Sequence, residues 1–147
     1  MQSRIAHDLL FSLGIVKNGE KIIKGRFGKP YIEGSGTFFN ISHTDGAIAI
    51  AVSDAEVGVD IQSLRMISDA AMRRFVGELP PPDPILRTRL WTRCESHAKW
   101  LSCGLPTTIP DREHVFFEYD FQGIPVCVCT SLEITSCEVV YLDEEGL

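Results

Sequence analysis

Apolar side chains recur along the chain at two different spacings, and each spacing predicts a different kind of element. Near the N-terminus they fall three and four positions apart, which is typical of one face of a helix. These positions are Ile5, Leu9, Leu10 and Leu13. The spacing predicts a helix over Gln2–Leu13, and Gly14 directly after it suits a helix end.

The pattern then changes to short apolar runs, which are typical of strands. Expected strands cover Tyr31–Ile32, Phe38–Ser42, Ala47–Val52 and Val57–Gln62. Thr44-Asp45-Gly46 supplies hairpin-turn residues between the second and the third. In Val57–Gln62 apolar and polar residues alternate, so we expect a half-buried strand with Asp60 and Gln62 on the same face.

The second half of the chain is expected to hold two further helices and three strands. Ser68 can cap a short helix over Asp69–Val76 that Gly77 ends, and Asp83 can cap a longer helix that begins at Pro84. The longer helix carries an apolar stripe of Leu90, Cys94, Ala98 and Leu101, with Gly104 beyond its end. Expected strands cover Val115–Phe121, Pro125–Thr130 and Glu138–Leu142, with a turn at Gln122-Gly123.

This order of elements predicts the α+β class, with a mainly antiparallel sheet and packed helices. The length of 147 residues suits one compact unit, and 44% hydrophobic and 23% charged residues are typical of soluble globular proteins. No apolar run approaches the ~20 residues of a membrane span. The N-terminus lacks the features of a signal peptide, so we expect a cytoplasmic protein that does not act on a membrane.

Charge is distributed unevenly along the chain. The formal net charge of −6 argues against nucleic acid as the main partner. Residues 57–110 nevertheless hold seven bases and five acids, whereas residues 111–147 hold nine acids and one base. A local basic surface would suit an anionic ligand or an acidic partner protein.

The cysteines do not form a metal-binding or disulfide pattern. They are Cys94, Cys103, Cys127, Cys129 and Cys137. Their number is odd and no C-x-x-C pair occurs, so we expect buried free thiols rather than a zinc site or a disulfide framework. Cys127 and Cys129 alternate within an apolar run, which predicts that they share one face of a strand.

Several residues carry candidate chemistry, and each also has a structural interpretation. Asp60 lies inside an apolar strand, where a carboxylate is costly unless it pairs or binds a cation; the alternative is a strand-end Asp with a backbone partner. Glu95 and Lys99 lie one helical turn apart, which is also the spacing of an ordinary surface ion pair. His43 precedes a turn, where a histidine is usually structural or exposed.

A fourth feature is a glycine-rich turn, and all four features occur in the order of a known family. In the turn, Arg26 and Lys29 flank a glycine and would suit a phosphate. The matching segments are Gly28–Pro30 (G-K-P), Phe39–Thr44 (F-N-I-S-H-T), Gly58–Ile61 (G-V-D-I) and Trp91–Lys99 (W-T-R-C-E-S-H-A-K). From about Arg4 to Leu105 the chain resembles the 4'-phosphopantetheinyl transferases, in particular the larger, surfactin-synthetase-activating type.

The resemblance implies a reaction and a set of roles. The family moves the phosphopantetheine arm of coenzyme A onto a serine of an acyl or peptidyl carrier protein, with Mg²⁺ and with release of adenosine 3',5'-bisphosphate. By the match, Asp60 and Glu95 are metal ligands, and Glu95, or a water it holds, is the base for the serine proton. Lys99 matches the lysine that contacts the phosphates near the reacting centre.

Other matched residues are expected to bind the coenzyme. His43 matches the histidine that binds a coenzyme A phosphate. Lys29 and Arg26 are expected to flank the nucleotide end, and Arg4 matches an N-terminal arginine that contacts the 3'-phosphate.

The chain also departs from the family pattern. Gln62 stands where the family usually has Glu, so it would offer the metal a neutral amide oxygen and weaken Mg²⁺ binding. Cys94 replaces the basic residue before Glu95, and Ser102-Cys103-Gly104-Leu105 lacks the lysine of the usual G-K-G-L.

The resemblance implies two similar halves with the active site between them. Residues 1–56 would be an N-terminal half that lacks its opening strand, and residues 57–147 would be the C-terminal half with the metal and catalytic motifs. We expect a monomer rather than a homodimer, although an incomplete first half could leave a sheet edge that dimerises.

Three functions remain open at this point. The first is an active phosphopantetheinyl transferase. The second is a degenerate relative that binds coenzyme A or a carrier protein without efficient transfer, which Gln62, Cys94 and the shortened first half favour. The third is an unrelated α+β binding domain. Retention of the other motif residues together argues for the first.

Overall fold

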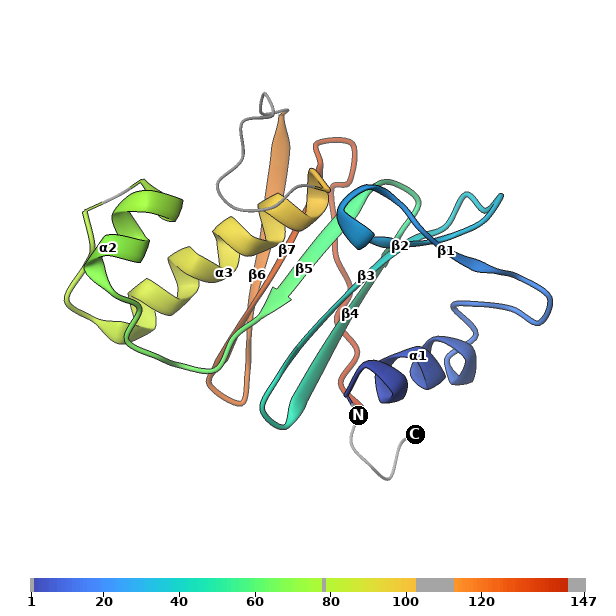
Figure 1. The fold of residues 1–147 in the computed structure, drawn as a ribbon, viewed down its shortest axis with the longest axis horizontal. Coiled ribbons are helices and arrows are strands. Elements are labelled where there is room, and N and C mark those ends of the chain that lie inside the picture. Colours follow the sequence, from blue (N-terminus) through green and yellow to red (C-terminus); the bar gives the residue numbers. More distant parts are fainter. Residues whose placement is uncertain (1, 78, 103–112, 143–147) are drawn as a thin grey trace.

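The computed structural model describes residues 2–77, 79–102 and 113–142, without the side chains of residues 2, 3 and 26. Over these ranges the chain is α+β, with three small antiparallel sheets rather than one main sheet (Figure 1). The helices are α1 (Gln2–Ser12), α2 (Asp69–Ala71) and α3 (Pro84–Trp100), with the single turns η1 (Arg26–Gly28) and η2 (Met72–Val76). The strands are β1 (Ile22–Lys24), β2 (Pro30–Ile32), β3 (Phe38–Thr44), β4 (Ala47–Ser53), β5 (Val57–Ile61), β6 (His114–Phe121) and β7 (Ile124–Ser131).

The β3–β4 hairpin forms the middle of the molecule. Asp45 and Gly46 make its turn, and the positive φ of 73° at Gly46 explains why glycine stands there. One face of the hairpin packs against α1 and β2 in an apolar core, whose buried members are Leu10, Val16, Ile32 and Phe39. Its other face packs against β5 and β7, through Ala51, Val57 and Val59. Figure 1 shows the result, with α1 and α3 on opposite sides of the hairpin.

Strand β5 is buried along its whole length, so the expectation of a half-buried strand was wrong. It pairs with β7 in the sheet order β5–β7–β6. Val57, Val59 and Ile61 face the hairpin, whereas Gly58 and Asp60 lie on the face that α3 covers. Alternate residues lie on opposite faces of the strand, as predicted. Both faces, however, pack against other elements, so every residue from Val57 to Ile61 is buried.

Helix α3 begins as the sequence predicts, but its buried side is not the expected stripe. Asp83 accepts the Ile85 N–H, and Pro84 is the first helical residue. Leu90 and Cys94 are only half-buried, while Ala98 and Leu101 are buried. The fully buried residues include Thr88, Thr92 and Ser96, which are at most 1% exposed. Gly104 lies outside the described residues.

These three hydroxyl residues let α3 lie very close to β5. Thr88 Oγ1 donates to Pro84 O at 2.8 Å, Thr92 Oγ1 to Thr88 O at 2.7 Å and Ser96 Oγ to Arg93 O at 2.8 Å. Each hydroxyl thereby has a hydrogen-bond partner within the helix, and Thr88 Oγ1 also bonds to the Arg65 backbone. At the closest point a methyl group on Gly58 would overlap the backbone of Ser96 and of Trp100. Small side chains on both the strand and the helix therefore allow the two backbones to pack closely.

The short helix after β5 follows the prediction. Ser68 accepts the Ala71 N–H at 3.2 Å, and Gly77 ends the segment with a positive φ of 77°. Between them the first turn is α-helical and the second is a π-type turn. None of the helices in the described parts of the chain is long and apolar enough to cross a membrane.

The expected strand over Glu138–Leu142 was wrong. In the described residues from 132 to 142 there is no helix or strand, and Val140 and Tyr141 are exposed. The Tyr141 ring stacks on Phe121, with ring centroids 5.7 Å apart. β-Branched and aromatic residues favour a strand only where another strand pairs with them, and within the described residues β7 is the only strand paired with β6.

The cysteine expectation holds in part. Cys127 and Cys129 are thiols outside any disulfide, and they are buried and on the same face of β7, as predicted. Cys94 is also a thiol outside any disulfide but is half-buried, and it donates to Phe75 O at 2.9 Å. Cys137 is free and exposed, so it is not a buried thiol, because it lies in the unpaired segment after β7. Cys103 lies outside the described residues.

Candidate functional site at the free edge of strand β5

The two edges of β5 are satisfied in different ways. Toward β7, backbone groups pair in a regular antiparallel ladder in which Asp60 faces Cys127. Toward β3 there is no ladder, and side chains take its place. The Val59 N–H donates to Asn40 Oδ1 at 2.8 Å, and the Ile61 N–H donates to Ser42 Oγ at 3.2 Å. The F-N-I-S-H-T segment therefore closes this edge with polar side chains, which leaves room for further polar groups beside it.

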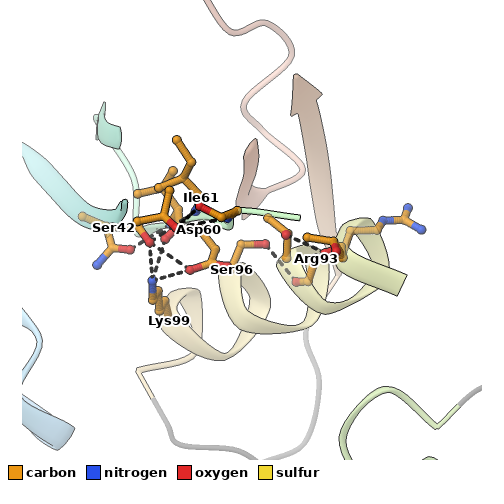
Figure 2. Close-up of polar contacts among 12 residues, drawn as sticks. Ser42, Asp60, Ile61, Arg93, Ser96 and Lys99 are labelled. Atoms are coloured by element: carbon orange, nitrogen blue, oxygen red, sulfur yellow. Dashed lines mark hydrogen bonds and ion pairs between the residues drawn. The ribbon is translucent and has the colours of Figure 1, made fainter. Parts of the chain in front are cut away.

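Asp60 is the centre of these polar groups (Figure 2). It is 5% exposed, and its Oδ1 accepts from Ser42 Oγ at 2.9 Å and from Lys99 Nζ at 2.8 Å. Its Oδ2 is buried and has no hydrogen-bond partner. A buried carboxylate oxygen without a donor is costly, so this atom is a candidate cation ligand. The alternative interpretation of Asp60, a strand-end residue with a backbone partner, does not describe these contacts.

Ser42 and Lys99 are fully used by this cluster. Ser42 Oγ donates to Asp60 and accepts from Ile61 N and Lys99 Nζ, which exhausts the bonding capacity of a hydroxyl. Lys99 Nζ donates to Asp60 Oδ1, to Ser42 Oγ at 3.0 Å and to Val59 O at 3.1 Å. Lys99 comes from the last turn of α3, so three elements meet at this point.

Glu95 lies one turn before Lys99 on α3 and is half-buried. Burial raises the pKa of its carboxyl above the usual range, and the charge of Asp60 raises it further. The charges of Lys99 and Arg65 act in the opposite direction. The structure thus brings Asp60, Glu95 and Lys99 into one electrostatic group, as the motif spacing suggested.

Arg65 is a residue that the sequence analysis missed. Its guanidinium lies over the Trp91 ring, 5.6 Å from the ring centre, and its charge reaches Glu95. The backbone beside it is held by Thr88 Oγ1, which accepts the Arg65 N–H at 3.3 Å. The signal was present in the excess of basic residues over 57–110, but nothing in the sequence singled out this one.

The two carboxylates fit a hard divalent cation. Mg²⁺ is commonly held by one or two carboxylates together with waters and substrate phosphates, and Asp60 Oδ2 and the Glu95 carboxylate are the candidate protein ligands here. Neighbouring carboxylates also repel each other, and a cation between them would relieve this repulsion. Among the described residues there is no group of three or more His, Cys, Asp or Glu side chains that could hold a metal. A site made by protein ligands alone is therefore not found in these parts of the chain.

Gln62 follows the last residue of β5. Its N–H donates to Pro125 O at 3.2 Å, which continues the pairing with β7 by one bond. The alternation along the strand therefore extends to Gln62 and assigns it to the face of Gly58 and Asp60. Gln62 is half-buried.

His43 and Arg4, two of the residues expected to bind the coenzyme, do not contact this cluster. His43 is exposed, and strand alternation assigns it to the face of β3 opposite Ser42. Arg4 is exposed on α1, on the other side of the hairpin from α3 (Figure 1). The Arg26 side chain lies outside the described residues. The structure therefore does not gather these residues around Asp60.

Lys29 is buried, unlike a typical phosphate-binding lysine. Its side chain is 6% exposed, and Nζ donates to Glu56 Oε2 at 3.0 Å, Val57 O at 2.8 Å and Lys99 O at 2.9 Å. All of these acceptors belong to the protein. This placement joins the G-K-P turn to the start of β5 and to the end of α3.

Cys127 is the thiol nearest to the cluster in the β5–β7 ladder. Burial raises the pKa of its thiol to about 12. A thiol in this state is not a nucleophile at neutral pH, because the thiolate is the reactive form. The chemistry of the cluster therefore belongs to its carboxylates and its lysine.

Comparison with known proteins gives the same family as the motifs. No family model matches the chain. Two curated proteins are similar to it, each named 4'-phosphopantetheinyl transferase AcpT, from Salmonella typhimurium and Salmonella typhi. Each is 27% identical over 135 residues, covering 78% of this chain and 70% of the relative. The four motifs and this similarity along most of the chain support its membership of the 4'-phosphopantetheinyl transferase superfamily.

Proposed function

We propose that the protein transfers the 4'-phosphopantetheine arm of coenzyme A to a serine of an acyl or peptidyl carrier protein, in a reaction that requires Mg²⁺. One observation supports this proposal most strongly. Three motifs that lie far apart in the sequence meet at the free edge of β5, where Asp60 keeps a buried, unpartnered oxygen beside Glu95. The names of the curated relatives support the same transferase class.

In this proposal Asp60 and Glu95 hold the metal. Bound there, Mg²⁺ would neutralise the charge that grows on the phosphoryl oxygens as the pyrophosphate is cleaved. Ser42 and Lys99 fix the Asp60 carboxylate through Oδ1 and leave Oδ2 for the metal. Gln62 would offer an amide oxygen on the same side of the strand.

The remaining chemistry belongs to Glu95 and Lys99. Glu95, or a water that it orients, would take the proton of the attacking serine hydroxyl, which then bonds to the phosphorus of the phosphopantetheine arm. The bond to adenosine 3',5'-bisphosphate breaks in the same exchange. Lys99 would approach the phosphates by exchanging one of its three protein acceptors for a phosphate oxygen.

The test is an intact-mass measurement on purified apo carrier proteins of the acyl and the peptidyl type, incubated with coenzyme A and Mg²⁺. The proposal expects the carrier to gain the mass of one phosphopantetheine group on its serine. A carrier whose serine is replaced by alanine is the matched control and should gain nothing. No mass gain on any apo carrier that an authentic transferase modifies would contradict the proposal.

A second function, binding without transfer, is favoured by one observation. All three hydrogens of Lys99 Nζ point to protein acceptors, and His43 lies on the face of β3 opposite the cluster. If this arrangement persists with coenzyme A bound, the phosphates are not activated. Calorimetry with coenzyme A, run beside the mass assay, separates the two, because binding without a mass gain would select this function.

A further inference from the structure

We propose that Lys29 is a positioning residue that acts on Lys99 through the Lys99 backbone. This inference rests on the proposed function, because it gives Lys29 a part in transfer. It differs from the role that the sequence resemblance implies, in which Lys29 flanks the nucleotide end of coenzyme A.

The three bonds of Lys29 join segments that are distant in the sequence. Its ammonium lies between Glu56 Oε2, Val57 O and Lys99 O, at 3.0, 2.8 and 2.9 Å. The first two acceptors belong to the entry into β5, and the third is a carbonyl in the last turn of α3. One side chain therefore ties the strand that carries Asp60 to the turn that carries Lys99.

A buried ammonium is well suited to this place. Lys99 O already accepts the Ser102 N–H at 3.2 Å, and a carbonyl at the C-terminal end of a helix carries partial negative charge, so it favours a cation as its second donor. Val57 O lies on the edge of β5 that has no backbone ladder with a neighbouring strand, so it also needs a donor from a side chain. The Glu56 carboxylate balances the charge and is itself only 26% exposed.

The position of the Lys99 backbone decides what its side chain can reach. From the last turn of α3 its ammonium extends to Ser42 Oγ, Val59 O and Asp60 Oδ1. Gly58 brings the helix backbone against the strand at the same level. Lys29 holds the carbonyl of the residue whose ammonium holds Asp60, so a shift of this carbonyl would move the Lys99 side chain relative to Asp60.

The two roles of Lys29 predict different kinetics. A lysine that contacts a coenzyme phosphate supplies binding, so its loss should weaken coenzyme A affinity. A positioning residue acts on the geometry of the reacting groups, so its loss should lower kcat and leave the coenzyme A dissociation constant nearly unchanged. A donor that lacks the ribose 3'-phosphate, 3'-dephospho-coenzyme A, adds a second comparison.

The experiment uses Lys29→Met, which keeps an unbranched side chain out to the ε position and removes the ammonium with its charge and donors. We expect kcat to fall about ten- to a hundredfold with either donor, and both dissociation constants to stay within about twofold of wild type. A rise in the coenzyme A dissociation constant with little change in kcat would overturn the proposal. So would a loss confined to the donor that carries the 3'-phosphate.

Tyr31→Phe is the matched control. Tyr31 is two residues from Lys29, and its hydroxyl bonds to Ser102 Oγ at 2.9 Å and lies near the Glu56 carboxylate. Tyr31→Phe removes this second tie to the end of α3, while it keeps the ring beside Lys29 and all three acceptors of Lys29. We expect its kcat to stay within about twofold of wild type. An equal loss of kcat in Tyr31→Phe and Lys29→Met would overturn the proposal, since any tie between these segments would then suffice.

Two further measurements keep the proposal testable if Lys29→Met does not fold or if the wild type does not transfer. Glu56→Gln keeps the shape of the partner and both carbonyl bonds of Lys29, and we expect a smaller fall in kcat with unchanged coenzyme A affinity. Hydrogen exchange needs no activity: amides of the last turn of α3 should exchange faster in Lys29→Met, or in Glu56→Gln, than in Tyr31→Phe. Equal exchange in the variants would refute the positioning role, whereas an inactive wild type with the expected exchange would refute only the proposed function.

Discussion

The two edges of β5 carry the same backbone groups but are completed by different partners. On one edge β7 supplies a continuous ladder of backbone bonds from Val57 to Ile61. On the other edge Asn40 and Ser42 accept the N–H groups, and the ammonium groups of Lys29 and Lys99 donate to the carbonyls. In a backbone ladder the strand's polar groups bond only to backbone groups. Where side chains bond to the strand edge instead, ionisable groups are held at defined positions beside it. The polar site of this protein lies where strand pairing stops.

The largest expected effect is on transfer, and it comes from Asp60 at the edge without a ladder. Asp60→Asn removes the charge of the unpartnered oxygen while keeping the shape of the side chain. Losing a charged ligand to a metal-bound phosphoryl group costs about 4 kcal/mol, so transfer should fall about a thousandfold. Single-turnover rates at saturating Mg²⁺ measure this.

Asp120→Asn is the control for that variant. Asp120 is an exposed carboxylate on β6 that pairs with Arg89 at 3.0 Å, and its loss should leave transfer unchanged. Equal transfer rates in the two variants would remove Asp60 from the site.

The next effect is on stability, and it tests the contact between β5 and α3. Gly58→Ala would drive a methyl group into the backbone of Ser96 and Trp100, which cannot move aside as a flexible side chain can. We expect a loss of about 3 kcal/mol in the free energy of unfolding. Urea denaturation measures this loss. Gly36→Ala is the matched control, because a methyl group there meets nothing within 4 Å. Similar midpoints for the two variants would contradict the close approach.

Ser42→Ala breaks the side-chain closure of β5 directly. It leaves the Ile61 N–H without its acceptor and removes one donor from Asp60. We therefore expect the free energy of unfolding to fall by about 1–3 kcal/mol. Ser12→Ala removes an exposed hydroxyl that donates to Asp8 O and should change stability by less than about 0.5 kcal/mol. Thermal unfolding of both variants decides whether the free edge of β5 depends on Ser42.

Glu95 gives a smaller effect on stability, and the size of this effect depends on pH. Its carboxyl has a raised pKa, so the ionised form is disfavoured in the folded protein, and this destabilisation is present at neutral pH and absent once the unfolded-state carboxyl is protonated. Glu95→Gln should therefore raise the unfolding temperature of the metal-free protein slightly at pH 7. The difference should vanish below about pH 4. A lower unfolding temperature at pH 7 would contradict this assignment, and the exposed Glu33→Gln serves as control.

The smallest effect is expected at the end of β5, from Gln62→Glu. This substitution adds an anionic oxygen on the face of Asp60, and hard-cation sites gain affinity with ligand charge. Transfer should reach half its maximum at a lower Mg²⁺ concentration, with coenzyme A affinity unchanged. An unchanged Mg²⁺ midpoint would mean that Gln62 points away from the metal.

Much of the fold follows from local patterns in the sequence, while the errors come from contacts between elements. The hairpin turn at Gly46, the Ser68 cap and the start of α3 at Pro84 are set by neighbouring residues, and each was predicted. The burial of both faces of β5 and the pairing of β6 depend on contacts between elements that are distant in the sequence. Local sequence patterns therefore do not predict that β5 is fully buried or that Glu138–Leu142 stays unpaired.

For the candidate site, the structure can be compared with the placement of the residues, and their roles stay predictions. Asp60, Glu95 and Lys99 are brought together as the motifs implied, because the family pattern already contains information about tertiary structure. The motif assigned roles by residue type, however, and residue type does not say which partners surround a side chain. Lys29 and Lys99 are both motif lysines, yet Lys29 is enclosed by protein acceptors and Lys99 lies beside Asp60.

The most direct test of the metal site is the binding of Mn²⁺, a paramagnetic substitute for Mg²⁺, followed by backbone NMR. Mn²⁺ broadens the signals of nearby amides, and it reports on the site without any need for transfer. If Asp60 and Glu95 hold the metal, broadening should appear first at Asp60 and along the turn of α3 that holds Glu95, and it should be lost in Asp60→Asn but not in Asp120→Asn. Broadening centred elsewhere, or unchanged in Asp60→Asn, would contradict the claim that the free edge of β5 holds the metal.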